Sequence, residues 1–173
     1  MRVTFGPGVI CLALGAMLFL TAPVGAEETL PARKAGLWEL TTSMDEGRGP
    51  REQSMKICID AEMEANTVQA SLAEHKKSCE KYQIKKDGGK VAVDMTCEFN
   101  GRHVESLTEM EGDFANTFKI KIASTTSDTR ESTQQTITVK RVILQDGKYL
   151  GEGCGELKGG EAQAPDGSKM MVQ

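Results

Sequence analysis

Apolar and polar residues alternate with a period of two through most of the chain between residues 36 and 155. The clearest run is 91–99, in which every odd-numbered residue is apolar or cysteine. Shorter runs of the same kind occur at 38–44, 55–59 and 118–122. Strands with one apolar face, separated by turns rich in Gly, Asp and Asn, are typical of antiparallel sheets.

The alternation is interrupted once, in the run that starts at Ile137 and Val139. Its apolar positions slip by one residue after Arg141 and resume at Val142 and Leu144. A slip of one residue predicts either a β-bulge or a strand that changes the face it buries.

One segment, residues 60–78, follows a helical period instead. Its apolar residues recur at i, i+4, i+7 and i+11 as Ala61, Ala65, Val68 and Leu72. Asp60 can cap the start of this helix, and the basic residues near its end suit the negative pole of the helix dipole. Because the apolar stripe is thin and rich in alanine, the helix should depend on packing against the sheet.

These patterns together predict a mainly β fold. We expect an antiparallel sheet of seven or eight short strands that curls into a barrel or half-barrel, with one helix inserted near residues 60–78. A curved sheet of this kind can bury one face and leave a groove.

The first 26 residues have the pattern of a secretory signal peptide. Arg2 is followed by the uncharged apolar run 9–20 and by Pro-Val-Gly-Ala at 23–26, which predicts cleavage after Ala26. Cys11 lies inside the apolar run and is preceded by isoleucine, which disfavours a lipoprotein signal. The sequence therefore predicts export to an oxidising compartment such as the periplasm.

The exported part divides into three segments. A polar lead at 27–35 precedes a single β-rich domain at 36–156, and the Gly-rich segment 157–173 is predicted to be a flexible tail. Cleavage leaves 147 residues of the 173, which suits one domain with its own core.

Charge and hydropathy exclude several classes of partner. The exported part carries 20 basic and 25 acidic residues, so it has no basic stripe for nucleic acid and little attraction to an anionic membrane. It has no second apolar run near the roughly 18 residues that a spanning helix needs. We therefore expect a soluble protein that binds no nucleic acid and does not span a membrane.

Four cysteines remain after cleavage, Cys58, Cys79, Cys97 and Cys154, and three pairings are open to them. The sequence has no Cys-x-x-Cys and lacks the spacing of a zinc site, so structural disulfides are favoured over redox or metal chemistry.

A hairpin turn at Gly88-Gly89 narrows the choice of pairing. A two-residue turn there fixes which residues face each other: Ile84 with Val93, and Tyr82 with Met95. The same register places Cys97 opposite Glu80, one residue from Cys79, so a local irregularity would bring the two sulfurs together. We therefore predict a Cys79–Cys97 disulfide, which leaves Cys58 to pair with Cys154.

Catalytic and cofactor signatures are missing from the sequence. The two histidines, His75 and His103, are interpreted as surface residues, and no hydrolase or nucleotide motif occurs. The glycines on either side of Cys154 indicate a turn next to a disulfide. Scattered methionines could suit Cu(I), but single methionines in strands are ordinary core fillers. We expect no enzyme activity, no cofactor and no metal.

The combined pattern resembles a family known as domain of unknown function 3617. The resemblance covers about Pro31 to Gly155 and rests on Gly-Leu-Trp-Glu at 36–39, on Cys58 before an acidic helix and on the three later cysteines. It implies a small exported protein of Gram-negative bacteria but no activity. Members commonly have Cys-Leu-Thr where this chain has Cys58-Ile-Asp, a change that preserves the capping chemistry.

Two functions from different classes fit this description. The first, which we favour from the sequence, is a binding module that holds a small apolar molecule or lipid on a concave face. Four residues would either line that face or belong to the core: Trp38, Leu40, Val93 and Phe118. The second is a structural or interaction protein of the cell envelope whose core is filled. A continuous apolar cavity would favour the first, and a filled interior the second.

Overall fold

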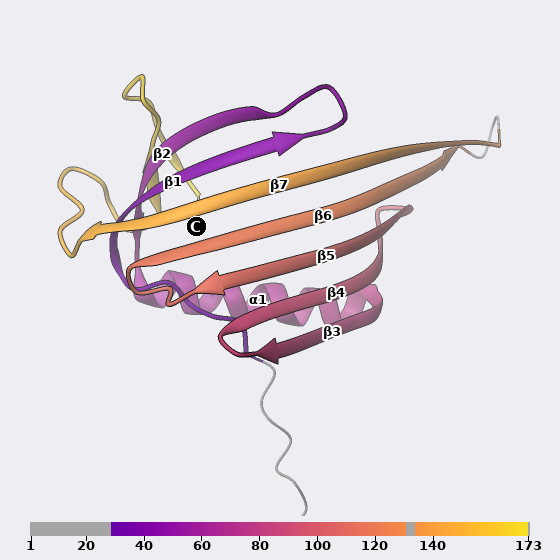
Figure 1. Ribbon diagram of the computed structural model, residues 1–173, viewed down its shortest axis with the longest axis horizontal. Coiled ribbons are helices and arrows are strands. Elements are labelled where there is room, and N and C mark those ends of the chain that lie inside the picture. The colour runs from indigo at the N-terminus through magenta and orange to yellow at the C-terminus, as the bar shows by residue number, and fades with distance from the viewer. Residues whose placement is uncertain (1–28, 131–133, 173) are drawn as a thin grey trace, which may run out of the picture.

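The computed structural model of the chain describes residues 29–130 and 134–172 (Figure 1). The predicted signal peptide, residues 1–26, lies outside the described residues.

In the described residues the fold contains nine strands and one helix, so the prediction of a mainly β protein is confirmed. The elements in chain order are β1 (Gly36–Asp45), β2 (Arg51–Ile59), α1 (Ala61–Ser78), β3 (Cys79–Asp87), β4 (Lys90–Phe99), β5 (Arg102–Gly112), β6 (Thr117–Arg130), β7 (Gln135–Gly151), β8 (Glu161–Gln163) and β9 (Lys169–Met171).

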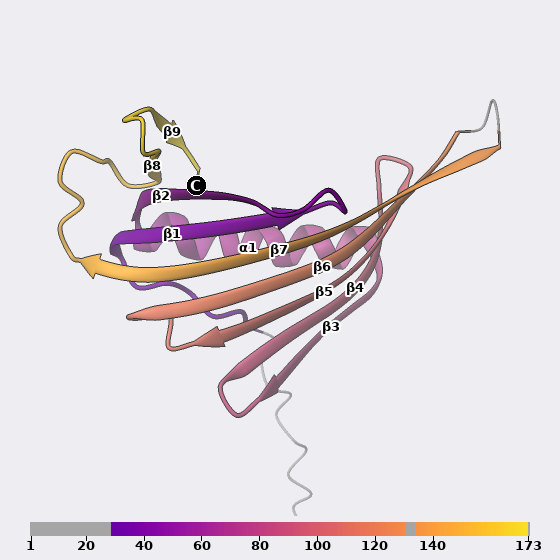
Figure 2. The ribbon, with the colours of Figure 1, turned by 45° about the horizontal axis from the view of Figure 1, so that its top comes forward.

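All nine strands form one curved antiparallel sheet in the order β3-β4-β5-β6-β7-β1-β2-β8-β9. The sheet does not close, so the half-barrel form of the prediction is correct and the closed barrel is not. Figures 1 and 2 show that helix α1 is the connection between two distant strands of the sheet. It carries the chain across one face of the sheet, from β2 near one edge to β3 at the other.

The β3–β4 hairpin has the register that its turn predicts. Gly88 and Gly89 both have positive φ, 53° and 86°, as a two-residue hairpin turn requires. Ile84 pairs with Val93, as expected from this turn. The neighbouring β4–β5 turn uses Asn100 and Gly101 in the same way.

Helix α1 starts where the sequence predicts. The Asp60 carboxylate accepts hydrogen bonds from the backbone N–H groups of Glu62 and Met63 at 3.0 and 2.9 Å. Two of the described side chains of the helix, Glu64 and Leu72, are buried. The helix therefore buries few apolar side chains, and polar contacts with other parts of the chain must help to hold it in place.

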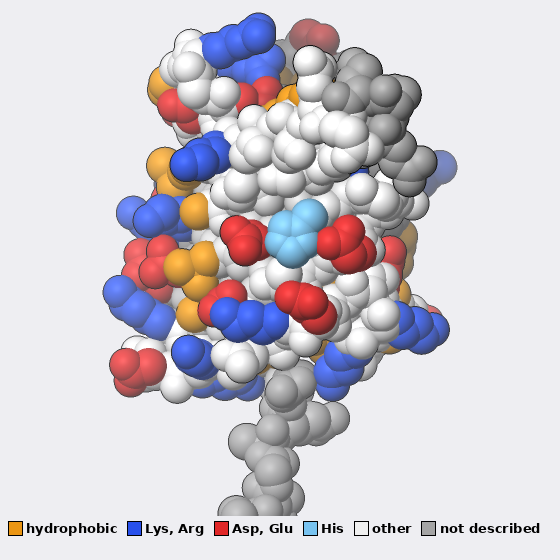
Figure 3. Space-filling model, turned by 90° about the vertical axis from the view of Figure 1, so that its right-hand side faces the viewer, with side chains coloured by type: hydrophobic (Ala, Val, Ile, Leu, Met, Phe, Trp, Pro, Cys, Tyr) orange, Lys and Arg blue, Asp and Glu red, His pale blue; other side chains and the backbone are white. Residues whose placement is uncertain are grey.

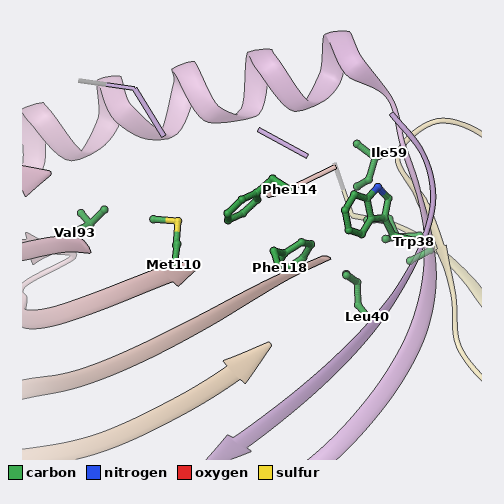
Figure 4. Packing of buried hydrophobic residues seen from close by; sticks show 9 residues of the cluster. Trp38, Leu40, Ile59, Val93, Met110, Phe114 and Phe118 are labelled. Atoms are coloured by element: carbon green, nitrogen blue, oxygen red, sulfur yellow. The ribbon is translucent and has the colours of Figure 1, made fainter. Parts of the chain in front are cut away.

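The hydrophobic core lies on the face of the sheet that the helix crosses (Figure 4). At its centre, the ring of Trp38 lies 5.4 Å from that of Phe118, and Phe114 stacks on Phe118 at 5.3 Å. Trp38 and Phe118 are 0% and 1% exposed. The buried cluster comprises Trp38, Leu40, Ile57, Ile59, Val93, Met110, Phe114, Phe118 and Ala162.

Gly147 on β7 pairs with Phe118 and provides the space for its ring. A Cβ atom at this glycine would lie 2.2 Å from Cε1 and 2.4 Å from Cζ of Phe118. The aromatic core therefore packs directly on a bare stretch of β7 backbone.

The predicted irregularity near Arg141 is absent from the β6–β7 ladder, which keeps one register throughout. The apolar positions slip because β7 carries apolar residues on both faces of the sheet. Val142 and Leu144 lie on the face away from the helix and are 40% and 44% exposed. The register shift lies instead between Leu37 and Trp38, where β1 pairs with the end of β7.

The segment 157–173 was expected to be a flexible tail, but its described part, residues 157–172, contributes β8 and β9 to the sheet. Lys56 and Ile57 of β2 pair with β8, and Ala162 is 1% exposed in the core cluster. The Gly160 N–H also donates to the Cys58 carbonyl oxygen at 2.8 Å. With β8 and β9, the described residues contain nine strands, one more than the seven or eight expected.

Candidate functional site

The residues predicted to line a ligand-binding face are all buried. Trp38, Leu40, Val93 and Phe118 belong to the core cluster and pack against one another or their neighbours (Figure 4). None of the five grooves described for this chain is lined by any of these four side chains. They therefore belong to the packed interior of the protein.

A buried ion pair that the sequence analysis missed holds the polar lead against the helix. Arg33 donates from Nε and Nη2 to the two carboxylate oxygens of Glu64, at 2.9 and 2.6 Å. The Arg33 backbone N–H adds a bond of 3.1 Å to the same carboxylate. The two residues are 31 positions apart, and no periodic pattern links them. The pair explains how a helix with so few buried apolar residues is held.

Both predicted disulfides are present, Cys58–Cys154 and Cys79–Cys97. The β3–β4 register shifts between Cys79 and Lys81, so Cys79 pairs directly with Cys97. This is the local irregularity that the hairpin register requires.

The two histidines lie in different surroundings. Nδ1 of His75 lies 2.6 Å from the Ser71 carbonyl oxygen, and the ring stacks on that of Tyr82 with centroids 5.4 Å apart, so the side chain is half-buried and less exposed than expected. The His103 side chain is 44% exposed, and its Nδ1 lies 2.7 Å from Glu98. Figure 3 shows a histidine at the surface between acidic side chains. The hydrogen bond to Glu98 raises the pKa of His103 above its ordinary value.

Residues 29–130 and 134–172 contain no cluster of three or more His, Cys, Asp or Glu side chains placed to hold a metal ion. Within the same ranges, no helix has the length and apolar character needed to cross a membrane.

A groove of about 450 Å³ runs across strands β3 to β7 and is lined by charged residues together with Val91, Ile120 and Met110, the last a member of the core cluster. Its walls are cross-strand ion pairs, such as Lys90–Glu111 at 3.2 Å and Lys121–Glu109 at 3.4 Å. Because each of these cations faces an acid, the groove has no excess charge with which to select a charged ligand.

A second candidate site is the edge of β2 that faces away from β1. Strand β8 pairs only with Lys56 and Ile57, so in the described part of the chain no strand covers residues 51–55 on that side. We call these residues the uncovered β2 edge. The Cys58 carbonyl oxygen points to this side, because it accepts from Gly160 in the segment that leads into β8. Backbone groups alternate in direction along a strand, so the N–H and C=O groups of Ser54 and Glu52 also point outward.

Two grooves flank the uncovered β2 edge, one of about 330 Å³ and one of about 470 Å³. Both are bounded by the edge itself and by the turn between β8 and β9. The smaller also contacts Glu39 and Lys56, whereas the larger contacts Gln53 and Met170. The two grooves adjoin each other, because Ser54, Met55, Ala164 and Pro165 line both of them.

The β8–β9 hairpin beside this edge exposes large apolar side chains. Met170, Met171 and Val172 are all exposed, with Met171 at 60%. This site was not expected from the sequence, because these residues lie in a Gly-rich segment that resembles a flexible tail. Two adjacent methionines in a polar segment are the signal that points to it.

The sequence profile of a known family matches residues 33–154. The chain belongs to the DUF3617 family. This family is described as proteins of unknown function. No curated protein and no solved structure matches the chain. The DUF3617 match includes Arg33 and both disulfides, and it ends at Cys154. The β8–β9 hairpin follows the matched residues, so one wall of the candidate site lies beyond the family region.

Proposed function

We propose that the protein is an exported interaction protein that binds another protein through the uncovered β2 edge and the adjoining β8–β9 hairpin. The observation that carries this proposal is a bare strand edge beside exposed Met170, which lines one groove with Met55 and is followed by exposed Met171. Unpaired strand edges are templates for pairing with another chain. Clusters of exposed apolar residues commonly mark protein interaction sites.

The packing of the core supports an interaction protein over a small-ligand carrier. A carrier would need a cavity of roughly 300–1,000 Å³ lined by apolar side chains. Trp38 and Phe118 instead fill the concave face with their rings 5.4 Å apart. An apolar ligand on that face would have to displace these side chains from each other.

Export is part of this proposal and rests on residues 1–26 together with the disulfides. Disulfides persist in oxidising compartments such as the periplasm and are rare in the cytosol. Two of them in one small domain agree with the predicted signal peptide. The absence of any recognisable nucleophile or acid–base arrangement in the sequence leads us to propose that the protein is not an enzyme.

Site-specific photo-crosslinking in the producing cells tests this function. A photoreactive residue at Met171 should give one discrete heavier adduct that contains a second protein. The same residue at Gln69, exposed on α1, is the matched control and should give none. No adduct at Met171, or equal adducts at both positions, would overturn the proposal.

Native mass spectrometry of the exported protein provides the complementary measurement. We expect the mass of the disulfide-bonded chain without a stoichiometric small molecule. A small molecule that co-purifies in a one-to-one ratio would favour the ligand-carrier function instead.

A further inference from the structure

We infer that the partner contributes an extended segment, which adds to the sheet as a strand along the uncovered β2 edge. The segment has apolar side chains at alternate positions and a basic residue that faces Glu52. This inference rests on the proposed function and specifies its partner.

The backbone of the edge supplies the first part of the argument. Ser54 and Glu52 direct their N–H and C=O groups away from β1, which gives two donors and two acceptors along the edge. At about 3.3 Å per residue, the five residues of the edge offer roughly 17 Å, which is enough for a strand of typical length. Strand addition uses such backbone groups for affinity and neighbouring pockets for specificity.

The side chains of β2 and β9 also bear on the partner, because successive side chains of an added strand point to opposite faces of the sheet. Pairing places Met55 and Met170 on the face that carries the core, where both line the groove of about 470 Å³. On the other face the strand would meet Ser54 and Glu52 of β2. One set of its side chains should therefore be apolar and the other polar.

The charge of Glu52 indicates which polar side chain the added strand should carry. Glu52 is exposed on the face away from the core, and its side chain has no ion pair within the described residues. Opposite charges directly across two strands are favourable, and like charges are not. A lysine or arginine opposite Glu52 thus complements the edge.

A second copy of this chain fits the site less well. If two uncovered β2 edges paired antiparallel about Gln53, each would present Arg51, Gln53 and Met55 to the core-side groove of the other. Only the methionine among these three matches the apolar wall formed by Met170 and Pro165. A different protein with a regularly alternating segment is the better occupant.

A proline substitution at Glu52 is the sharpest perturbation, because it removes an outward N–H and leaves the pairing with β1 intact. Proline is tolerated on edge strands when its nitrogen faces away from the ladder. Glu52→Ala is the matched control, since it removes the same charge but keeps the N–H. Circular dichroism should show the same fold for both variants and the unchanged protein.

The probe is a fluorescent nine-residue peptide with valine at every second position, serine between, and one lysine at the central polar position. We expect saturable binding to the full chain and binding about two- to fivefold weaker for Glu52→Ala, because this variant loses the charge opposite the lysine. Glu52→Pro, which also loses the outward N–H, should bind at least tenfold more weakly than Glu52→Ala. Amide shifts in NMR spectra should be confined to β2, β8 and β9. A peptide of the same composition with its valines in one block should bind at least tenfold more weakly.

Three results would overturn the inference: no binding of the alternating peptide, equal binding by Glu52→Pro, or equal binding of the block peptide. Concentration-dependent dimerisation that Glu52→Pro abolishes would identify a second copy as the occupant and would also overturn it. If the Met171 crosslink persists while the peptide fails, the proposed function stands and strand addition does not. If the crosslink is also absent, both fail.

Discussion

Replacing Gly147 by alanine should destabilise the protein through a single steric conflict with Phe118. The added Cβ would lie 2.2, 2.4 and 2.7 Å from three atoms of the Phe118 ring. Ordinary carbon contacts are about 3.5–4.0 Å, so the ring must move by more than about 1 Å. The ring cannot move freely, because it is 1% exposed and packs between Trp38 and Phe114.

Overpacking of a filled core costs about 1–3 kcal/mol, and this site should fall at the upper end because all three contacts involve one enclosed ring. For a domain of this size, about 3 kcal/mol corresponds to a decrease in Tm of roughly 9 °C. Gly147 does not have a positive φ, so backbone strain adds nothing to this estimate. Phe118→Leu removes two of the three clashing atoms, at its own cost of roughly 1.5 kcal/mol.

Urea unfolding of the oxidised protein, followed by fluorescence of Trp38, measures these effects directly, since this is the single tryptophan of the chain. The double variant Gly147→Ala/Phe118→Leu should lose at least about 1.5 kcal/mol less than the sum of the two single variants. Gly153→Ala, which meets nothing within 4 Å, is the control and should change stability by less than about 0.5 kcal/mol. Additive costs, or a neutral Gly147→Ala, would refute the packing argument.

Three further predictions concern the ion pair, the disulfides and the exposed histidine. Arg33→Met should lower the free energy of unfolding by about 3 kcal/mol, because it removes the guanidinium that neutralises the buried Glu64 carboxylate, and adding Glu64→Gln should restore more than half. Equal losses for the single and double variants in urea unfolding would contradict this. The Cys58–Cys154 disulfide spans 96 positions and the Cys79–Cys97 disulfide spans 18. Replacing both cysteines of a disulfide by serine should therefore lower the free energy of unfolding by about 4–5 kcal/mol for the first and about 3 kcal/mol for the second. Calorimetry that ranks the two losses in the reverse order would contradict the loop-entropy explanation. NMR titration should give His103 a pKa above 6.5, and Glu98→Gln should lower that pKa. The contribution of His103 to the free energy of unfolding should be complete below pH 6.5 and lost as pH rises through the raised pKa. An unchanged pKa in Glu98→Gln would show that the Glu98 hydrogen bond is not the cause.

Features that depend on neighbours in sequence could be predicted well. The Asp60 cap needs only the next three residues, and the β3–β4 register needs only the turn at Gly88-Gly89. The Cys79–Cys97 pair follows from that register. In each case the interaction is local, so residue type and spacing contain the necessary information.

Features that depend on distant parts of the chain could not be predicted. Ala162 is among the most buried residues, but a small side chain in a Gly-rich segment gives no apolar signal. The Arg33–Glu64 pair joins two residues that each look like ordinary surface charges. The four residues assigned to a binding face were correctly identified as apolar and inward-facing, but alternation cannot tell whether the space before them is empty.

The candidate site was hidden for the same reason. Whether β2 has an uncovered edge depends on how many of its residues the later strand β8 covers, and β8 follows it by about a hundred positions. The sequence analysis recognised the strand at 55–59 but had no means of placing it near an edge of the sheet.

The strand order also has a consequence for the sequence of events in folding. Strands β3 to β7 each pair with the next in the chain, so this meander can form as soon as its residues are available. Strand β1 pairs with β2 on one side, but its other side pairs with β7, which joins Leu37 to Gly151. Contacts so far apart in the chain form slowly, because the loop must close before the contacts can stabilise it. In a chain made from its N-terminus, β1 and β2 therefore wait for β7, and the bond between Cys58 and Cys154 should be the last of the two disulfides to form.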